Sequence, residues 1–375
     1  MDTLITNIGQ LVTPRSRGQD HGSADSTLYV SHDVEIRIRD GRFVDVGDAL
    51  AADAVDERID AEGGVVLPGF IDPNGNLGSP SPAASEPQET SEWRAKRERR
   101  VRRFLARMLD AGITSVEVRC GAQHGALDDL ITLQQLGGGV PRITSTVLCT
   151  RRVGGDGDLA SLIGDVIPTI RRRRLARFCA VDCGPDSFSI TEARTILRAA
   201  RGAGLLLKLH GDGTDSHDLI RLAAELDVTS VDLLSSVAPH EAAQLKAAGV
   251  MPVVLPGHAF VHAGQRPDVR RMLDADLPVA IGSSLGRDEP GVGSMWMVLA
   301  LAIVECGMTL DEAIVACTRG NAMALGLGDE VGTIEPGKAA DVVLLDLEDY
   351  RELAQGLGGG PVRAVVRGGK VVDRS

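Results

Sequence analysis

Both ends of the chain show short runs in which apolar and polar residues alternate, the pattern of half-buried β-strands. Runs at 34–38 and 43–46 flank Asp40-Gly41, a strong signal for a two-residue hairpin turn. The carboxyl end has the same texture at 342–345, 364–367 and 371–372, with a turn at Gly368-Gly369. Since chain termini often lie close together, we expect the two groups of strands to form one small β domain.

The middle of the chain instead carries apolar, β-rich runs separated by stretches with helical spacing. The clearest helix follows Ser91, where apolar residues recur up to Leu109 and Ala111-Gly112 ends the pattern. Strands alternating with helices predict a (β/α)8 barrel; the alternative, a doubly wound open sheet, lacks its Gly-rich phosphate motif after the first strand. The eight runs are 65–71, 114–118, 143–148, 178–181, 205–209, 230–234, 251–255 and 279–281.

These patterns predict an α/β chain of 375 residues with three segments. We expect 65–330 to form a TIM-like barrel, and 1–64 and 331–375 to form a small β-sandwich domain together. A hydrophobic content of 43% with only 3% aromatic residues fits this class, because parallel strands covered by helices are rich in aliphatic side chains.

Net charge and cysteine content limit the classes of partner and the cellular compartment that we expect. The formal net charge of −12 argues against nucleic acid or an anionic membrane as partner, because both attract basic surfaces. No apolar stretch reaches the roughly 18 residues that cross a bilayer, and the first ten residues lack the features of a signal peptide. Six scattered cysteines indicate reduced thiols, so we expect a cytoplasmic protein.

Two long motifs carry a resemblance to a known family. Residues 64–73, GVVLPGFIDP, resemble the first barrel strand of the amidohydrolase superfamily, and 332–341, GTIEPGKAAD, resemble the turn that leads back into its β domain. Within that superfamily the sequence pattern is most similar to that of imidazolonepropionase, which opens a five-membered imidazolone ring. The resemblance implies the barrel fold, a small-molecule substrate and a homodimer.

The resemblance also implies a metal ion that activates water at the barrel mouth, where the carboxyl ends of the strands meet. The family holds this ion with a His-x-His pair after strand one, a histidine after strand five and an aspartate after strand eight. Here the pair reads Asn74 and Asn76, His210 is kept, Ser284 takes the aspartate position, and Leu233 replaces a further catalytic histidine. Because amides are poor zinc ligands and one imidazole is not enough, we expect no bound metal and no cofactor.

Positions that would contact an imidazolone substrate differ as well. Arg119 and Cys120 stand where the family has a tyrosine after strand two. Cys149 and Arg151 stand where it has a histidine after strand three, and Gly213 replaces an acidic residue. The resemblance therefore does not imply the family's own substrate.

For catalysis we expect His210 and Asp212 to act as general base and orienting acid. The alternative is that His210 is an inherited core histidine hydrogen-bonded to the asparagines. Cys120 is a candidate nucleophile, or with Cys149 and Cys183 a zinc ligand, although a buried cysteine is more often a small apolar residue.

A further catalytic candidate is His258, which we place in a loop after strand seven. Arg119 and Arg287 would clamp a substrate carboxylate, or else form salt bridges to Asp182 or Asp232. The expected substrate-binding side chains are the polar residues at the strand ends: Asn74, Asn76, Arg119, Arg151, Asp182, Ser284 and Arg287.

Three functions remain open from the sequence. The first is a metal-independent enzyme that performs acid–base chemistry, by ring opening or closure or by water addition or elimination, on a small polar molecule containing nitrogen. The second is an inactive homologue that binds a metabolite or an active partner. The third is a C–N hydrolase with a rebuilt Cys/His zinc site.

Overall fold

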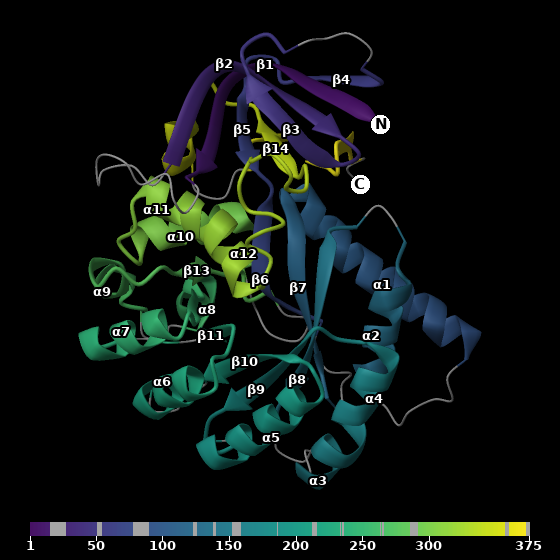
Figure 1. Ribbon diagram of the computed structural model, residues 1–375, viewed down its shortest axis with the longest axis vertical. Helices are drawn as coiled ribbons and strands as arrows, with labels where there is room; N and C mark the ends of the chain where they lie inside the picture. The colour runs from purple at the N-terminus through teal and green to yellow at the C-terminus, as the bar shows by residue number, and fades with distance from the viewer. Residues whose placement is uncertain are drawn as a thin grey trace.

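The computed structural model places a barrel of parallel strands and helices beneath a mixed sheet that contains both ends of the chain (Figure 1). Among the residues that the structure describes, no helix is long and apolar enough to cross a membrane. The described residues are 1–15, 28–50, 55–77, 90–122, 126–137, 140–151, 159–185, 187–211, 216–232, 234, 236–262, 264, 266–285, 292–356 and 360–372.

The barrel contains all eight of the expected strand segments, hydrogen-bonded in parallel and in chain order. This confirms the (β/α)8 prediction over the doubly wound sheet. The strands are β6 (Phe70–Asn76), β7 (Ile113–Gly121), β8 (Arg142–Cys149), β9 (Phe178–Cys183), β10 (Leu206–Gly211), β11 (Ser230–Asp232), β12 (Met251–Val254) and β13 (Ala280–Ile281).

Side chains close the barrel where β6 meets β13, because these two strands stand at opposite ends of the hydrogen-bonded order. The amide of Asn321 donates to the carbonyl oxygens of Ile71 (2.5 Å) and Ile281 (2.8 Å) and accepts from the Ile281 N–H (2.9 Å). Nearer the mouth, the Asp72 carboxylate accepts from the hydroxyl (2.5 Å) and the N–H (3.1 Å) of Ser283. The two contacts take the place of a backbone ladder.

Helices cover the outside of the barrel, as the helical spacing predicts. In α1 the Thr90 hydroxyl caps the amino end, Val101, Leu105 and Met108 face the core, and Gly112 follows with a φ of 85°. The α-helices are α1 (Ser91–Asp110), α2 (Ala126–Gln135), α3 (Leu159–Ser161), α4 (Ile167–Arg173), α5 (Ile190–Gly202), α6 (Ser216–Glu225), α7 (Pro239–Ala247), α8 (Pro256–Val261), α9 (Val269–Asp274), α10 (Met295–Val304), α11 (Leu310–Val315) and α12 (Asn321–Ala324).

The terminal segments form one continuous mixed sheet with its own buried apolar cluster. Asp40 and Gly41 form the predicted hairpin turn, and their φ values of 49° and 76° are those of a type I′ turn. The strands are β1 (Asp2–Pro14), β2 (Leu28–Arg39), β3 (Arg42–Gly47), β4 (Glu57–Asp60), β5 (Val65–Pro68), β14 (Val342–Leu345), β15 (Val362–Arg367) and β16 (Lys370–Val371).

Two details differ from the expectations. The run 65–71 is two strands, because β5 pairs with β1 and β14 while β6 begins the barrel. The boundary between the sheet and the barrel therefore falls at Gly69 rather than at 64/65. Gly69 is required there, since a Cβ would lie 2.1 Å from the Thr114 hydroxyl. The expected loop after strand seven also begins with a short helix, α8.

Candidate active site at the barrel mouth

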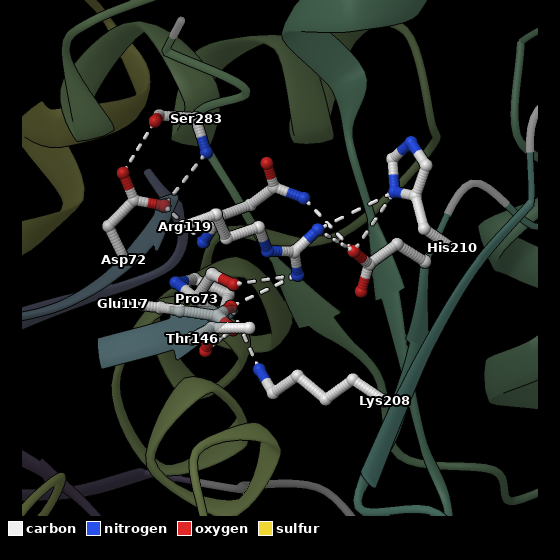
Figure 2. A network of polar contacts seen from close by, with 10 residues as sticks. Asp72, Pro73, Glu117, Arg119, Thr146, Lys208, His210 and Ser283 are labelled. Atoms are coloured by element: carbon white, nitrogen blue, oxygen red, sulfur yellow. Dashed lines mark hydrogen bonds and ion pairs between the residues drawn. The ribbon is translucent and has the colours of Figure 1, made fainter. Parts of the chain in front are cut away.

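Charged side chains, rather than apolar ones, fill part of the barrel interior. Glu117 and Arg119 are two residues apart on β7, and Lys208 and His210 are two apart on β10, so each pair points to the same side of its strand. Figure 2 shows the four side chains converging between the strands. Barrel interiors are usually filled by layers of branched apolar residues, so this network marks a specialised region.

The deeper part of the network is built around Glu117. Its carboxylate accepts from Lys208 Nζ (2.8 Å), from Arg119 Nη2 (3.0 Å) and from the Thr146 hydroxyl (2.6 Å). Both Glu117 and Lys208 are fully buried. Burial lowers the pKa of Lys208, and the neighbouring Glu117 charge only partly opposes this effect.

The part nearer the mouth is built around Asp232. Its Oδ2 atom lies 2.5 Å from Arg119 Nη1, 3.1 Å from the Asn74 amide nitrogen and 3.3 Å from His210 Nδ1. Burial opposes ionisation of Asp232, yet the Arg119 charge and the His210 contact hold the pKa of this carboxyl well below its usual range. Burial likewise opposes the charge of Arg119, but Asp232 and Glu117 keep its pKa above the ordinary value. The ion pair is therefore fully charged.

His210 is the member of the network that reaches solvent, with 22% of its side chain exposed. Its Nδ1 atom faces Asp232, while Nε2 points away from the network and bonds to none of the described residues (Figure 2). Nδ1 lies 3.3 Å from the Asp232 carboxylate and 3.5 Å from the Arg119 guanidinium, and the shorter contact favours the tautomer with the proton on Nδ1 and a lone pair on Nε2. Burial lowers the pKa of His210, but Asp232 outweighs it and the net pKa is raised.

Other expected substrate-binding residues lie around this network. Asn74 is buried and contacts Asp232, while Asn76 is half-buried at the end of β6. Asp182 pairs in register with His210 and accepts from the Thr150 hydroxyl at 3.0 Å. The Asp182 Oδ1 and Ser284 Oγ atoms have no hydrogen-bond partner within the described part of the chain. Such buried, unpaired acceptors are suited to a ligand that brings N–H donors.

Two further candidates contact side chains outside the network, and three others fall outside what the structure describes. Arg151 binds Glu192 of α5 (2.8 Å) and stacks over the Phe188 ring. His258 lies on α8 with its ring 4.4 Å from that of His262. Three positions fall outside the described residues: Asp212, Arg287 and Leu233.

The cysteines point away from the network, toward the helices. Cys120 is buried, and burial, with a smaller contribution from Asp129, raises the pKa of its thiol well above the ordinary value. Cys149 lies 3.9 Å from Cys179 rather than beside His210. Burial raises the pKa of Cys183 to about 12. Because thiolates are the reactive and metal-binding form, we assign none of these residues a catalytic or zinc-binding role.

Several residues of the network were missed from the sequence: Asp72, Glu117 and Lys208. A signal existed for Glu117 and Lys208, since each is a charge inside an otherwise apolar strand and lies two residues from a candidate. At that spacing the charge must share the candidate's side of the strand. Ser283 could not be separated from Ser284, because one residue of register decides which side chain meets Asp72.

Comparisons with known proteins agree with this architecture. A protein-family sequence model described as "Amidohydrolase family" matches residues 83–373 of the chain. The imidazolonepropionase of Solibacter usitatus is 32% identical over 417 residues, covering 100% of this chain and 99% of that protein. The imidazolonepropionase of Myxococcus xanthus is 32% identical over 416 residues, covering 100% of this chain and 98% of that protein.

Solved structures show the same fold. A triazine hydrolase variant gives a TM-score of 0.75 at 20% identity, covering 100% of this chain and 95% of that one. An adenosine deaminase from Xanthomonas campestris with bound zinc gives a TM-score of 0.73 at 19% identity, covering 99% of this chain and 92% of that one. Together with the family match, these findings show that the chain belongs to the amidohydrolase family and is related along its full length to imidazolonepropionases.

Proposed function

We propose that the protein is a metal-independent enzyme of this family, which performs acid–base chemistry at the barrel mouth on a small polar molecule containing nitrogen. The observation that carries the proposal is the contact between His210 and Asp232, with the Arg119 guanidinium bound to the same carboxylate oxygen. This arrangement orients a proton-transfer group and supplies a fixed positive charge.

The residues present do not fit the metal ion that the family implies. Two of the expected ligand positions carry amides, Asn74 and Asn76, and a third carries Ser284. The mouth brings together no three ligand atoms from His, Cys, Asp or Glu among the residues described. Arg119 adds a permanent positive charge 3.5 Å from His210 Nδ1, which opposes a divalent cation beside it.

The same residues support proton transfer. His210 Nε2 would accept a proton from the substrate or from an attacking water and return it to the leaving atom, while Asp232 holds the imidazole and stabilises its charged form. Arg119 is a positioning residue, because it is only 2% exposed and acts by keeping Asp232 ionised. Asp182 and Ser284 would accept hydrogen bonds from substrate N–H groups.

The test is turnover of a panel of lactams, cyclic ureides and imidazolones by the full chain. Turnover is monitored as the loss of ring absorbance, with and without EDTA. We expect turnover that EDTA leaves unchanged and that His210→Gln lowers by roughly 10²–10⁴-fold. Arg194→Gln is the matched control, since Arg194 of α5 pairs with Glu225 of α6 on the outside of the barrel.

Loss of turnover in EDTA with recovery on adding zinc would overturn the proposal. Ligands that raise the melting temperature without being turned over, in both the parent and His210→Gln, would favour the inactive, metabolite-binding homologue instead.

A further inference from the structure

A second cluster of chemically capable side chains lies on the outer rim of the barrel. His217 is on α6, and His240 and Glu241 are on α7, the neighbouring helix (Figure 1). One ligand atom from each of the three lies within 4.8 Å of the others. The cluster shares no residue with the network at the mouth.

Glu241 is held in place for binding. It is buried, with 5% exposure, and its Oε2 atom accepts from the Ala238 N–H at 2.6 Å as part of the helix cap. Its other oxygen, Oε1, lies 2.6 Å from His217 Nδ1. The carboxylate is thus fixed through one oxygen and presents the other to the histidines, while both imidazoles are on exposed, adjustable side chains.

We propose that His217, His240 and Glu241 form a rim site for a zinc-type divalent ion that bridges α6 and α7. Two imidazoles and one carboxylate are a ligand set that zinc favours, and they leave the fourth tetrahedral position to water. Bonds of about 2.1 Å require ligand atoms roughly 3.4 Å apart, so small rotations of the two exposed imidazoles complete the geometry.

The position gives such an ion a structural consequence. α6 follows β10, which carries His210, and α7 follows β11, which carries Asp232. An ion bound by the first turns of α6 and α7 would crosslink these two helices, which follow the strands that carry His210 and Asp232. The site can therefore stabilise the mouth without contacting its reacting groups.

The experiment is calorimetric titration of the chelator-treated full chain with zinc chloride, with melting curves in parallel. We expect about one ion per chain, and a melting temperature that rises with zinc concentration. His240→Ala and His217→Ala should weaken binding by at least roughly tenfold, and should melt like the parent when zinc is absent.

Three further variants make the test specific. Glu241→Gln keeps an oxygen for the Ala238 cap but loses the anionic ligand, so it should also weaken binding. His210→Ala and His32→Ala, which remove a mouth histidine and an exposed histidine of the terminal sheet, should bind like the parent. Zinc binding that survives His240→Ala, or that is lost in His210→Ala, would overturn the proposal; so would the absence of binding.

Discussion

Arg119 lies between two buried carboxylates, at 2.5 Å from Asp232 and 3.0 Å from Glu117. Lys208 is the second cation bound to Glu117, so within this group of four side chains two positive charges face two negative ones. Buried charges are costly to bring out of water, and each is tolerated because its partner stays in place. The stability of the barrel interior therefore depends on every member of this group.

The first prediction concerns Arg119→Leu, which leaves Asp232 and one side of Glu117 without their cation. We expect it to lower the free energy of unfolding by about 3–5 kcal/mol, measured by urea denaturation, because an uncompensated charge remains buried. The matched control is Arg119→Leu combined with Asp232→Leu, which restores the balance. It should be more stable than Arg119→Leu alone; a double variant that is less stable would show that charge compensation is not the cause.

The second prediction concerns the thiols. All six cysteines are buried, and burial raises the pKa of Cys306 to about 11 and of Cys183 to about 12. Thiolates form only as the pH approaches these values, so at pH 8 iodoacetamide should label the native chain far more slowly than the unfolded chain. Mass spectrometry counts the labelled sites. Rapid labelling of Cys120 in the folded protein would restore it as a candidate nucleophile.

Only part of the candidate site could be predicted from the sequence. Arg119 was predicted as a site residue and His210 was predicted from the family resemblance, whereas Glu117, two residues before Arg119 on the same strand, was missed. Which partner each charge meets could not be deduced, because contacts between strands depend on registers that side-chain alternation does not specify. The orientation of Cys120, one residue after Arg119, follows from the same alternation once Arg119 is known to face inward.

At the scale of elements, the joint between β6 and β13 is the distinctive feature. Asn321 offers two donors and one acceptor to the ends of these strands and replaces part of a backbone ladder. Gly320 allows this approach, since a Cβ there would lie 2.5 Å from the Val279 carbonyl oxygen. At this end the barrel therefore closes through a residue that belongs to neither strand, and nearer the mouth through Asp72 of β6 and Ser283.

The third prediction tests this joint. Asn321→Ala leaves buried backbone groups of Ile71 and Ile281 without partners, at a cost of about 1–3 kcal/mol for each unpaired group. We expect a total loss of about 3 kcal/mol or more in the free energy of unfolding, measured by urea denaturation. Gln355→Ala, at an exposed helix end, should change it by less than about 0.5 kcal/mol. Equal effects of the two variants would show that the joint does not hold the barrel closed.

The elements were easier to predict than their junctions. Each of the eight apolar runs contributes a barrel strand, the first of them only from Phe70 onward, because burial on both sides leaves a strong hydrophobic pattern. The division between β5 and β6 was not predictable, since an apolar run does not reveal that the chain changes sheets at Gly69. The short helix α8 was missed because Pro256-Gly257 reads as a loop, although proline is well suited to a helix start.

At the scale of the whole molecule, part of the terminal sheet belongs to the apolar core of the barrel, while the rest forms the sheet's own cluster. The largest cluster joins Val65 and Val343 of the sheet to Phe70 of the barrel and Trp296 of α10. The rings of Phe70 and Trp296 meet edge to face at 4.6 Å. The residues of the shared cluster are therefore buried only while sheet and barrel stay together.

The fourth prediction is that sheet and barrel unfold together. Calorimetry should show one transition, with equal calorimetric and van't Hoff enthalpies. Phe70→Ala should destabilise both parts at once by about 3–5 kcal/mol, because it empties the shared core. Two separate transitions, or a Phe70→Ala effect confined to one of them, would contradict this account.

We propose that Arg119, rather than a metal ion, supplies the positive charge at the mouth. Anomalous diffraction at the zinc edge, from crystals of the full chain soaked in zinc chloride, tests this directly. We expect no anomalous peak at the bonding distance of about 2.1 Å from His210 Nε2, with the Arg119 guanidinium still bound to Asp232. A peak at that distance, with Arg119 displaced from Asp232, would contradict it.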